Sequence, residues 1–267
     1  MTEKLAFLGV GNMASAIING VNAETVYLYD KLRDKCEAFA DRGYITVDSA
    51  SEAVKCADYI FIAVKPQNIP ELFGELKASG CDISGKLFIS IVAGLPISAF
   101  SDGLGCECAV VRTMPNTPMM IGMGVTALTR NDLVSDEDFE KVCSMFRTVS
   151  EIIVLPEDKM NAIISVTSSA PAYVYLFIES IRKSAEAQGI DDPETLSLIC
   201  SMVQGSAEML RRSDKTPAEL IRMVTSPGGT TERAMNVFAE RDLEGIINEA
   251  MIACTKRAEE LSSVKSE

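Results

Sequence analysis

The sequence lacks histidine and tryptophan altogether, and the missing histidine removes much of the familiar catalytic machinery. Serine or cysteine nucleophiles activated by histidine, histidine general bases and the usual zinc ligand sets are all excluded. Cysteine occurs at eight positions, but only Cys106 and Cys108 lie close together and no C-x-x-C pair exists. We therefore expect no metal site, and reduced thiols rather than disulfides.

Long hydrophobic runs and positive charge are also scarce. The apolar run at residues 59–64 falls far short of the ~20 residues that cross a membrane. The chain opens with Met-Thr-Glu-Lys and passes directly into a strand-like segment, so we expect no signal peptide and a cytoplasmic protein. Lys and Arg number 25 against 38 Asp and Glu, a net charge of −13, which excludes nucleic acid as an expected partner. Anionic ligands would have to be held by helix N-termini and backbone N–H groups.

The first half of the chain alternates strand and helix patterns. Short apolar runs predict strands at residues 5–8, 26–29, 59–64, 86–92, 109–113 and 125–129. Helical patterns between and after them include residues 12–21, 31–42 and 136–149. Such alternation is typical of βαβ units and predicts an α/β fold with a doubly wound parallel sheet.

The second half contains no convincing strand. Apolar residues recur at helical spacing over residues 160–166, 172–188, 193–211, 217–224, 231–239 and 243–261. Thr216, Pro217 and Glu219 form a strong helix start, because they supply a cap, a first-turn proline and a capping-box acid. The length suggests two domains. We expect the α/β domain at residues 1–156 and an all-helical domain at residues 157–267.

A glycine-rich turn joins the first predicted strand to the first predicted helix. Residues Gly9–Ala14 read G-x-G-x-x-A. Gly9 permits the tight turn, Gly11 lets a pyrophosphate approach the backbone, and Ala14 lets the helix pack closely on the strand. Asp30 ends the second strand, 21 residues after Gly9, where a carboxylate binds the ribose diol of NAD. The pattern predicts a Rossmann-type dinucleotide site, and the alternative is a turn that binds nothing.

Asp30 also bears on the choice of cofactor. Its carboxylate would repel a 2′-phosphate and so favours NADH. Lys31 and Arg33 follow at once and could instead hold that phosphate. We expect NADH or NADPH, with NADH favoured.

Three further turns follow predicted strands of the same half, at residues 63–67, 90–94 and 112–118. Because the carboxyl ends of strands in a doubly wound sheet face the ligand crevice, these turns are expected at the cofactor. The alternative is that their prolines only end the strands. A fourth segment, Thr225–Glu232, separates two predicted helices and contains Gly228 and Gly229. Its backbone N–H groups and the following helix start could receive a small anion such as a carboxylate, with the Thr231 hydroxyl beside it. A plain helix connection is the alternative.

Together these segments resemble pyrroline-5-carboxylate reductases. The matching motifs keep the family's order and spacing over about residues 4–262, and they are Gly9–Ala14, Ala63–Gln67, Met114–Pro118, Ala170–Tyr173 and Ser226–Thr231. The resemblance implies a Rossmann domain followed by a helical dimerisation domain, with some members forming decamers. It also implies hydride transfer from NADPH or NADH to the C=N bond of 1-pyrroline-5-carboxylate, which gives L-proline in the last step of proline biosynthesis.

The resemblance also assigns roles to individual residues. Thr231 is expected to be catalytic, because its hydroxyl would hydrogen-bond the substrate ring nitrogen. Substrate binding is expected at Ser226 and at the backbone of Gly228, Gly229 and Thr230. The expected cofactor contacts, in addition to Gly9, Gly11, Ala14 and Asp30, are Asn12, Met13, Ala63, Val64, Lys65, Pro66, Ala93, Pro115 and Asn116, of which the last three line the wall near the nicotinamide.

The chain departs from the family pattern at a few positions. Ser168 and Ala170 replace two glycines of S-G-S-G-P-A-Y, and Ala50 stands where many members have asparagine. A related cyclic imine therefore stays open as the substrate, as does a non-catalytic NAD(P)-sensing paralogue. A β-hydroxyacid dehydrogenase is disfavoured, because Lys159 and Asn161 do not have the spacing of its catalytic pair.

Apolar side chains at helical spacing predict an interface in the second half. They lie on one face of residues 193–211 and are Leu196, Ile199, Val203 and Leu210. We expect them to form core or dimer interface, and the protein to be a homodimer or a higher homo-oligomer.

Overall fold

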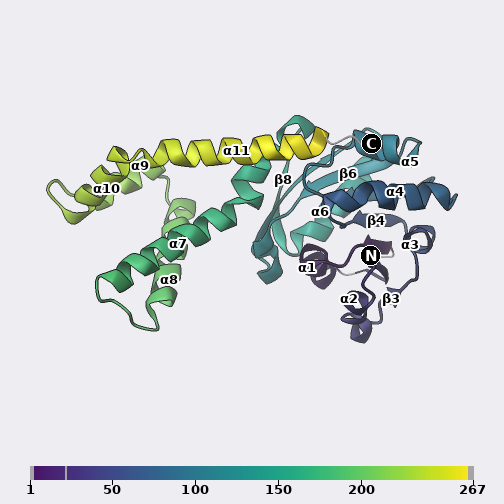
Figure 1. Ribbon diagram of the computed structural model, residues 1–267, viewed down its shortest axis with the longest axis horizontal. Coiled ribbons are helices and arrows are strands. Elements are labelled where there is room, and N and C mark those ends of the chain that lie inside the picture. The colour runs from purple at the N-terminus through teal and green to yellow at the C-terminus, as the bar shows by residue number, and fades with distance from the viewer. Residues whose placement is uncertain (1–2, 22, 264–267) are drawn as a thin grey trace. The chain divides into compact units, whose positions relative to one another are not determined.

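The computed structural model describes residues 3–21 and 23–263, and the chain forms two compact units (Figure 1). Unit 1 comprises Met1–Pro171 and Ala253–Glu267, and unit 2 comprises Ala172–Ile252. Residues 157–171 and the end of the last helix thus group with the sheet by their contacts. The boundary expected after residue 156 rests on the change from strands to helices, whereas the two units are defined by contacts.

Unit 1 is built on an eight-stranded sheet of order β3-β2-β1-β4-β5-β6-β7-β8. The strands are β1 (Lys4–Leu8), β2 (Thr25–Tyr29), β3 (Ile45–Thr46), β4 (Tyr59–Ile62), β5 (Leu87–Ser90), β6 (Ala109–Met114), β7 (Gly124–Arg130) and β8 (Ser150–Val154). Strands β1 to β6 are parallel and follow the doubly wound order 3-2-1-4-5-6. The predicted fold class is therefore confirmed. The two edge strands, β3 and β8, were not among the strands predicted from the sequence.

The strand predicted at residues 125–129 is present as β7, and it runs antiparallel to β6 with Met114 opposite Ala127. Residues 115–123 alone connect the two strands, whereas a parallel crossover needs a dozen or more residues. The chain therefore reverses direction, and β8 then pairs parallel to β7.

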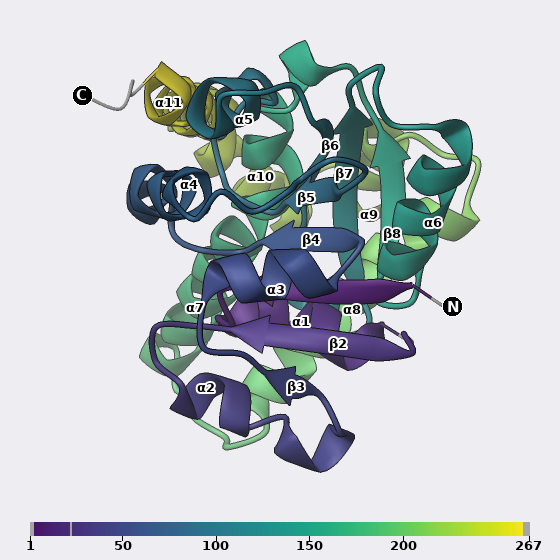
Figure 2. The same ribbon diagram turned by 90° about the vertical axis from the view of Figure 1, so that its right-hand side faces the viewer.

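Helices cover both faces of the sheet (Figure 2). One face is covered by α1 (Asn12–Gly20), α2 (Asp34–Glu37) and α6 (Asp136–Arg147), and the other by α3 (Ala50–Cys56), α4 (Ile69–Ala78) and α5 (Ser98–Leu104). Phe61 of β4 stacks on Phe7 of β1 in the first core, and Phe88 packs on Phe100 in the second. Because all four residues of β4 are buried between these cores, its sequence reads as an unbroken apolar run.

The helix predicted at residues 31–42 is wrong in its extent. Only α2 and a 3₁₀ turn at Ala40–Arg42 form there. The Asp30 carboxylate accepts a hydrogen bond from the Leu32 N–H at 2.9 Å, and this local bond bends the chain before a helix can start. The helix predicted at residues 160–166 is likewise replaced by a 3₁₀ turn at Glu157–Lys159 and a π-helical turn at Ile164–Ser168.

The second half of the chain is helical, as predicted. Its helices are α7 (Ala170–Ala187), α8 (Thr195–Arg212), α9 (Pro217–Val224), α10 (Thr230–Glu240) and α11 (Leu243–Ser263). The capping box of α9 is complete, with Thr216 and Glu219 each accepting a backbone N–H from the other. No helix among the described residues is long and apolar enough to cross a membrane.

Unit 2 buries little of its apolar surface within one chain. Across residues 172–252, all of which are described, Ile199 is the one buried hydrophobic side chain. Leu196 and Leu210 of the same helix are 47% and 42% exposed. Of the four apolar residues predicted on one face of α8, Leu196 and Leu210 are therefore exposed, whereas Ile199 is buried and Val203 half-buried.

Candidate functional site

The turn after β1 lies against the end of β4, and only glycine fits there. Gly9 has φ +100°, and a Cβ on it would lie 2.8 Å from the carbonyl carbon and oxygen of Ala63 and 2.9 Å from the Val64 nitrogen. Gly9 also donates its N–H to the Tyr29 carbonyl at 2.8 Å, which links the turn to the end of β2. The structure thus brings together the glycine turn, Ala63 and Val64, as the motif positions implied.

The start of α1 is open. Gly11 is its N-cap, and among the described residues no side chain caps the helix and no atom beyond its chain neighbours lies within 4 Å of a Cβ placed on Gly11. The first N–H groups of a helix have no partner within the helix, and the helix dipole favours an anion there. Asn12 is exposed, Met13 half-buried, and Ala14 is packed into the core. This bare cradle fits the pyrophosphate of a dinucleotide.

Asp30 makes a contact that the sequence did not indicate. Its Oδ2 accepts the Val10 N–H at 2.8 Å while Oδ1 accepts the Leu32 N–H, and the side chain is only 12% exposed. Asp30 therefore ties the end of β2 to the glycine turn. The carboxylate is held in place beside the cradle, which is the position expected for a ribose ligand.

The other predicted turns of unit 1 lie at the carboxyl ends of their strands. Lys65 is extended and exposed, and Pro66 begins a 3₁₀ turn. Ala93 is half-buried and precedes Gly94, where a Cβ would lie 2.9 Å from the Leu261 Cβ of α11. The Ala93 turn thus rests on the last turns of α11.

Pro115 and Asn116 are both buried. The Asn116 Oδ1 accepts the Val125 N–H at 2.8 Å, and its Nδ2 donates to the Thr167 carbonyl at 3.1 Å. The amide therefore holds the β6–β7 turn against the π-helical turn that precedes α7. Both hydrogen bonds are structural, and Asn116 positions the backbone of this turn.

A buried polar network lies next to these turns, and sequence reasoning missed it. Arg112 is 2% exposed, donates from Nη2 to Asn161 Oδ1 at 2.6 Å, and pairs with Glu157 at 3.5 Å. Burial is the largest influence on the Arg112 guanidinium and lowers its pKa, while Glu157 opposes that shift. Asn161 in turn donates to the Ser262 hydroxyl at 3.1 Å. The signal in the sequence was the single charge inside the apolar strand at residues 109–114.

The glycine-rich segment of unit 2 is formed, but part of it is occupied internally. Gly228 has φ +71° and donates its N–H to Glu232 at 2.9 Å, and the Gly229 N–H donates to the Ser226 carbonyl at 2.9 Å. Helix α10 starts at Thr230 without a side-chain cap among the described residues. The N–H groups of Thr230 and Thr231 thus lie in the first turn of the helix, and Thr231 is half-buried.

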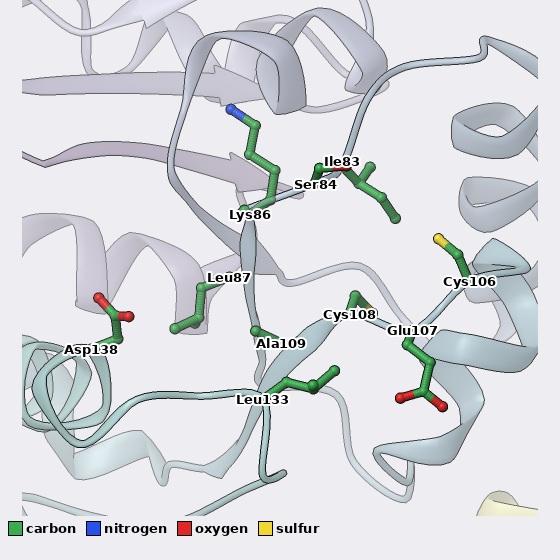
Figure 3. A pocket seen from close by; sticks show the side chains of 11 residues that line it. Ile83, Ser84, Lys86, Leu87, Cys106, Glu107, Cys108, Ala109, Leu133 and Asp138 are labelled. Atoms are coloured by element: carbon green, nitrogen blue, oxygen red, sulfur yellow. The ribbon is translucent and has the colours of Figure 1, made fainter.

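A cavity of about 400 Å³ lies at the opposite edge of the sheet, where β5 and β6 begin (Figure 3). None of the predicted site residues lines it. Two of the charged groups that line it make structural hydrogen bonds, since Lys86 donates to the Ala57 carbonyl and Asp138 accepts from the Tyr59 hydroxyl. Burial raises the pKa of Cys108 to about 12, which disfavours the reactive thiolate form of this lining residue. Among the described residues no group of three or more Cys, Asp or Glu side chains could hold a metal ion.

Two family models match the chain. The pyrroline-5-carboxylate reductase dimerisation model matches residues 157–261, and an NADP oxidoreductase model, described as coenzyme F420-dependent, matches residues 4–94. The first covers the helical half, and the second covers the glycine turn and Asp30.

Full-length similarity extends to characterised relatives and solved structures. The chain is 35% identical to the Escherichia coli K12 pyrroline-5-carboxylate reductase, over 98% of this chain and 99% of that one. A Coxiella burnetii pyrroline-5-carboxylate reductase structure superposes with a TM-score of 0.87 at 31% identity, covering 99% of this chain and 100% of the other. A Plasmodium falciparum pyrroline carboxylate reductase structure with NADP bound gives a TM-score of 0.89 at 28% identity, with 98% of each chain covered.

Proposed function

The chain belongs to the pyrroline-5-carboxylate reductase family, and from this premise we propose how its own residues serve the reaction. The enzyme reduces the C=N bond of 1-pyrroline-5-carboxylate to give L-proline, using a bound nicotinamide dinucleotide. The observation that carries this function is the full-length similarity to the Escherichia coli enzyme, together with the open cradle at the start of α1. When bound, the reduced nicotinamide supplies a hydride.

Unit 1 supplies the cofactor residues in this proposal. Gly9 fixes the turn, Gly11 leaves room for the pyrophosphate, and the first N–H groups of α1, from Asn12, Met13 and Ala14, donate hydrogen bonds to it. The backbone from Ala63 to Pro66 continues the same surface. Ala93, Pro115 and Asn116 form the wall at the nicotinamide.

Asp30 favours NADH. Its carboxylate is pinned by the Val10 and Leu32 N–H groups, so it cannot swing away from a 2′-phosphate. Asp30→Ser should shift the ratio of kcat/KM values for NADPH and NADH towards NADPH. Asp34→Ser, which removes the same charge from the exposed start of α2, is the matched control and should leave the ratio unchanged. A wild-type enzyme that already prefers NADPH by about tenfold contradicts this role of Asp30.

Unit 2 supplies the substrate residues. Ser226 and the backbone of Gly228, Gly229 and Thr230 receive the substrate carboxylate, which has to displace Glu232 from the Gly228 N–H and the Ser226 carbonyl from the Gly229 N–H. The Thr231 hydroxyl bonds the ring nitrogen and orients it. The ring nitrogen carries its own proton or shares the hydroxyl proton, so the reaction needs no histidine. The protein contributes positioning, which places the imine carbon at near-attack distance from the hydride.

The helical half contains the family's dimerisation domain. We propose that the domain begins at residue 157 and that the exposed face of α8 is buried in a homodimer, which can assemble further into a decamer. We also place the enzyme in the cytoplasm, a proposal that the eight free thiols support.

A direct assay tests the function. Purified full-length protein is mixed with NADH or NADPH, and cofactor oxidation is followed after addition of 1-pyrroline-5-carboxylate, with proline measured as the product. Faster turnover with 1-pyrroline, which lacks the carboxylate, would indicate a related cyclic imine as the substrate. Cofactor binding without turnover on either imine would indicate the non-catalytic paralogue.

A further inference from the structure

Three basic residues follow Asp30 along the chain: Lys31, Arg33 and Lys35. In this fold a basic side chain just beyond the end of β2 is what accommodates the 2′-phosphate of NADP. The sequence alone therefore left open whether these cations offset the effect of Asp30. The structure shows that each of them faces a carboxylate.

Lys31 pairs with a residue distant in sequence. Its Nζ lies 2.5 Å from the Glu71 Oε2, and Glu71 lies in the first turn of α4. The hydrogen bond to Glu71 is the largest influence on the Lys31 ammonium and raises its pKa. The pair joins the segment after β2 to a helix on the face covered by α3 and α4 (Figure 2).

Arg33 is engaged on two sides. Its Nη1 pairs with Asp48, which directly precedes the cap residue of α3, and its Nε lies 3.7 Å from the Glu37 Oε1 in α2. Lys35 points back to Asp30, with its Nζ 3.4 Å from the carboxylate. Four carboxylates thus face three cations, and the cluster carries a net negative charge.

We propose that Glu71 and Asp48 contribute to cofactor specificity alongside Asp30, because they engage Lys31 and Arg33 and so keep both cations from a 2′-phosphate. A 2′-phosphate has to displace both carboxylates and then remain among uncompensated negative charges. The free ribose diol of NADH needs neither cation. This inference rests on the proposed placement of the cofactor at the glycine turn and Asp30, and it adds residues from α4 and from the start of α3 to the specificity set.

The ion pairs are exposed, which sets the size of the effect. Lys31 and Glu71 side chains are 57% and 65% exposed, so each pair is a weak one. Releasing one cation should strengthen NADPH binding by about two- to fivefold, and releasing both by about tenfold. NADH binding should change by less than about twofold, because its diol gains no contact.

Binding measurements on the full chain test the proposal without turnover. Dissociation constants for NADPH and NADH are obtained by fluorescence titration, and those for 2′-AMP and 5′-AMP by calorimetry. The variants are the wild type, Glu71→Gln combined with Asp48→Asn, and the same pair in a Lys31→Ala, Arg33→Ala background. Asp34→Asn is the matched control, because it removes one carboxylate from the exposed start of α2 and belongs to neither the Lys31–Glu71 nor the Arg33–Asp48 pair.

We expect the variant that combines Glu71→Gln with Asp48→Asn to bind NADPH and 2′-AMP more tightly than the wild type. This gain in affinity should disappear when Lys31 and Arg33 are also replaced by alanine. An unchanged NADPH affinity in the double variant overturns the proposal, and so does a gain that survives removal of both cations. A gain of equal size in Asp34→Asn overturns it as well, since any lost charge would then suffice. The role of Asp30 is judged separately, because Asp30→Ser can shift the cofactor ratio whether or not the two pairs matter.

Discussion

Gly11→Ala should separate cofactor binding from folding. The N-cap has φ −86° and ψ 179°, which alanine adopts without strain. Among the described residues, the added methyl group would meet no atom within 4 Å beyond its own chain neighbours. Lower chain entropy in the unfolded state favours alanine by about 0.4–1 kcal/mol, and the poorer N-cap opposes it by a similar amount. The net change in the free energy of unfolding should stay within about 1 kcal/mol, or roughly 2–4 °C in Tm.

The same methyl group occupies the space through which the pyrophosphate reaches the start of α1. We expect the Kd for NADH to rise about 10- to 100-fold, which corresponds to about 1.4–2.8 kcal/mol. Gly9→Ala is the contrasting variant, because its methyl group would lie 2.8 Å from the Ala63 backbone at a φ of +100°. The clash and the strained backbone together should cost more than about 3 kcal/mol of stability.

Thermal unfolding and NADH titration on both variants check this reasoning. Gly11→Ala should melt like the wild type and bind weakly, whereas Gly9→Ala should lose stability first. Wild-type NADH affinity in Gly11→Ala would refute the placement of the pyrophosphate at α1. A large loss of stability in Gly11→Ala would refute the description of an open cradle.

Three further changes have defined outcomes. Thr231→Ala should lose a hydrogen bond worth about 1.5–3 kcal/mol to a charged partner, so kcat/KM should fall roughly 10- to 100-fold while NADH affinity holds and Thr231→Ser recovers most activity. Normal turnover with a lowered Tm in Thr231→Ala would reduce the residue to a helix-start role. The Ser135 hydroxyl and then the Tyr59 hydroxyl lower the pKa of Asp138, so its stabilisation is present above about pH 4 and is lost as the pH falls further. The Tm deficit of Asp138→Asn should accordingly be visible near pH 7 and shrink near pH 3, and an equal deficit at both would contradict this. Leu210→Glu should dissociate the dimer in sedimentation experiments, and a well-folded wild-type monomer at micromolar concentration would contradict the proposed interface.

Local signals in the sequence were sufficient to predict several elements of the fold. The start of α9 was predictable because Thr216, Pro217 and Glu219 act on one another within a single turn. The buried strand β4 was predictable because burial on both faces requires apolar residues throughout. The glycine turn was predictable because a backbone at φ +100° beside Ala63 admits only glycine.

Features that depend on tertiary pairing were not predictable. The direction of β7 and the edge strand β3 are set by which strand lies alongside, and β3 is only two residues long. Asp30 was identified from its position after β2, but its bond to Val10 depends on how the two turns meet. The pairing of Gly228 with Glu232 and the burial of Arg112 likewise follow from three-dimensional proximity.

Unit 2 has almost no hydrophobic core of its own, so its folding depends on the concentration of the protein. A segment of 81 residues that buries one hydrophobic side chain cannot offset its loss of conformational entropy alone. In the proposed homodimer, the dimerisation domain gains a hydrophobic interior when a second chain binds. Mass action then sets its stability, so its Tm rises with protein concentration while the sheet unit keeps its own core. For a newly made chain, folding of α10, which contains the proposed substrate residues, is accordingly a second-order process.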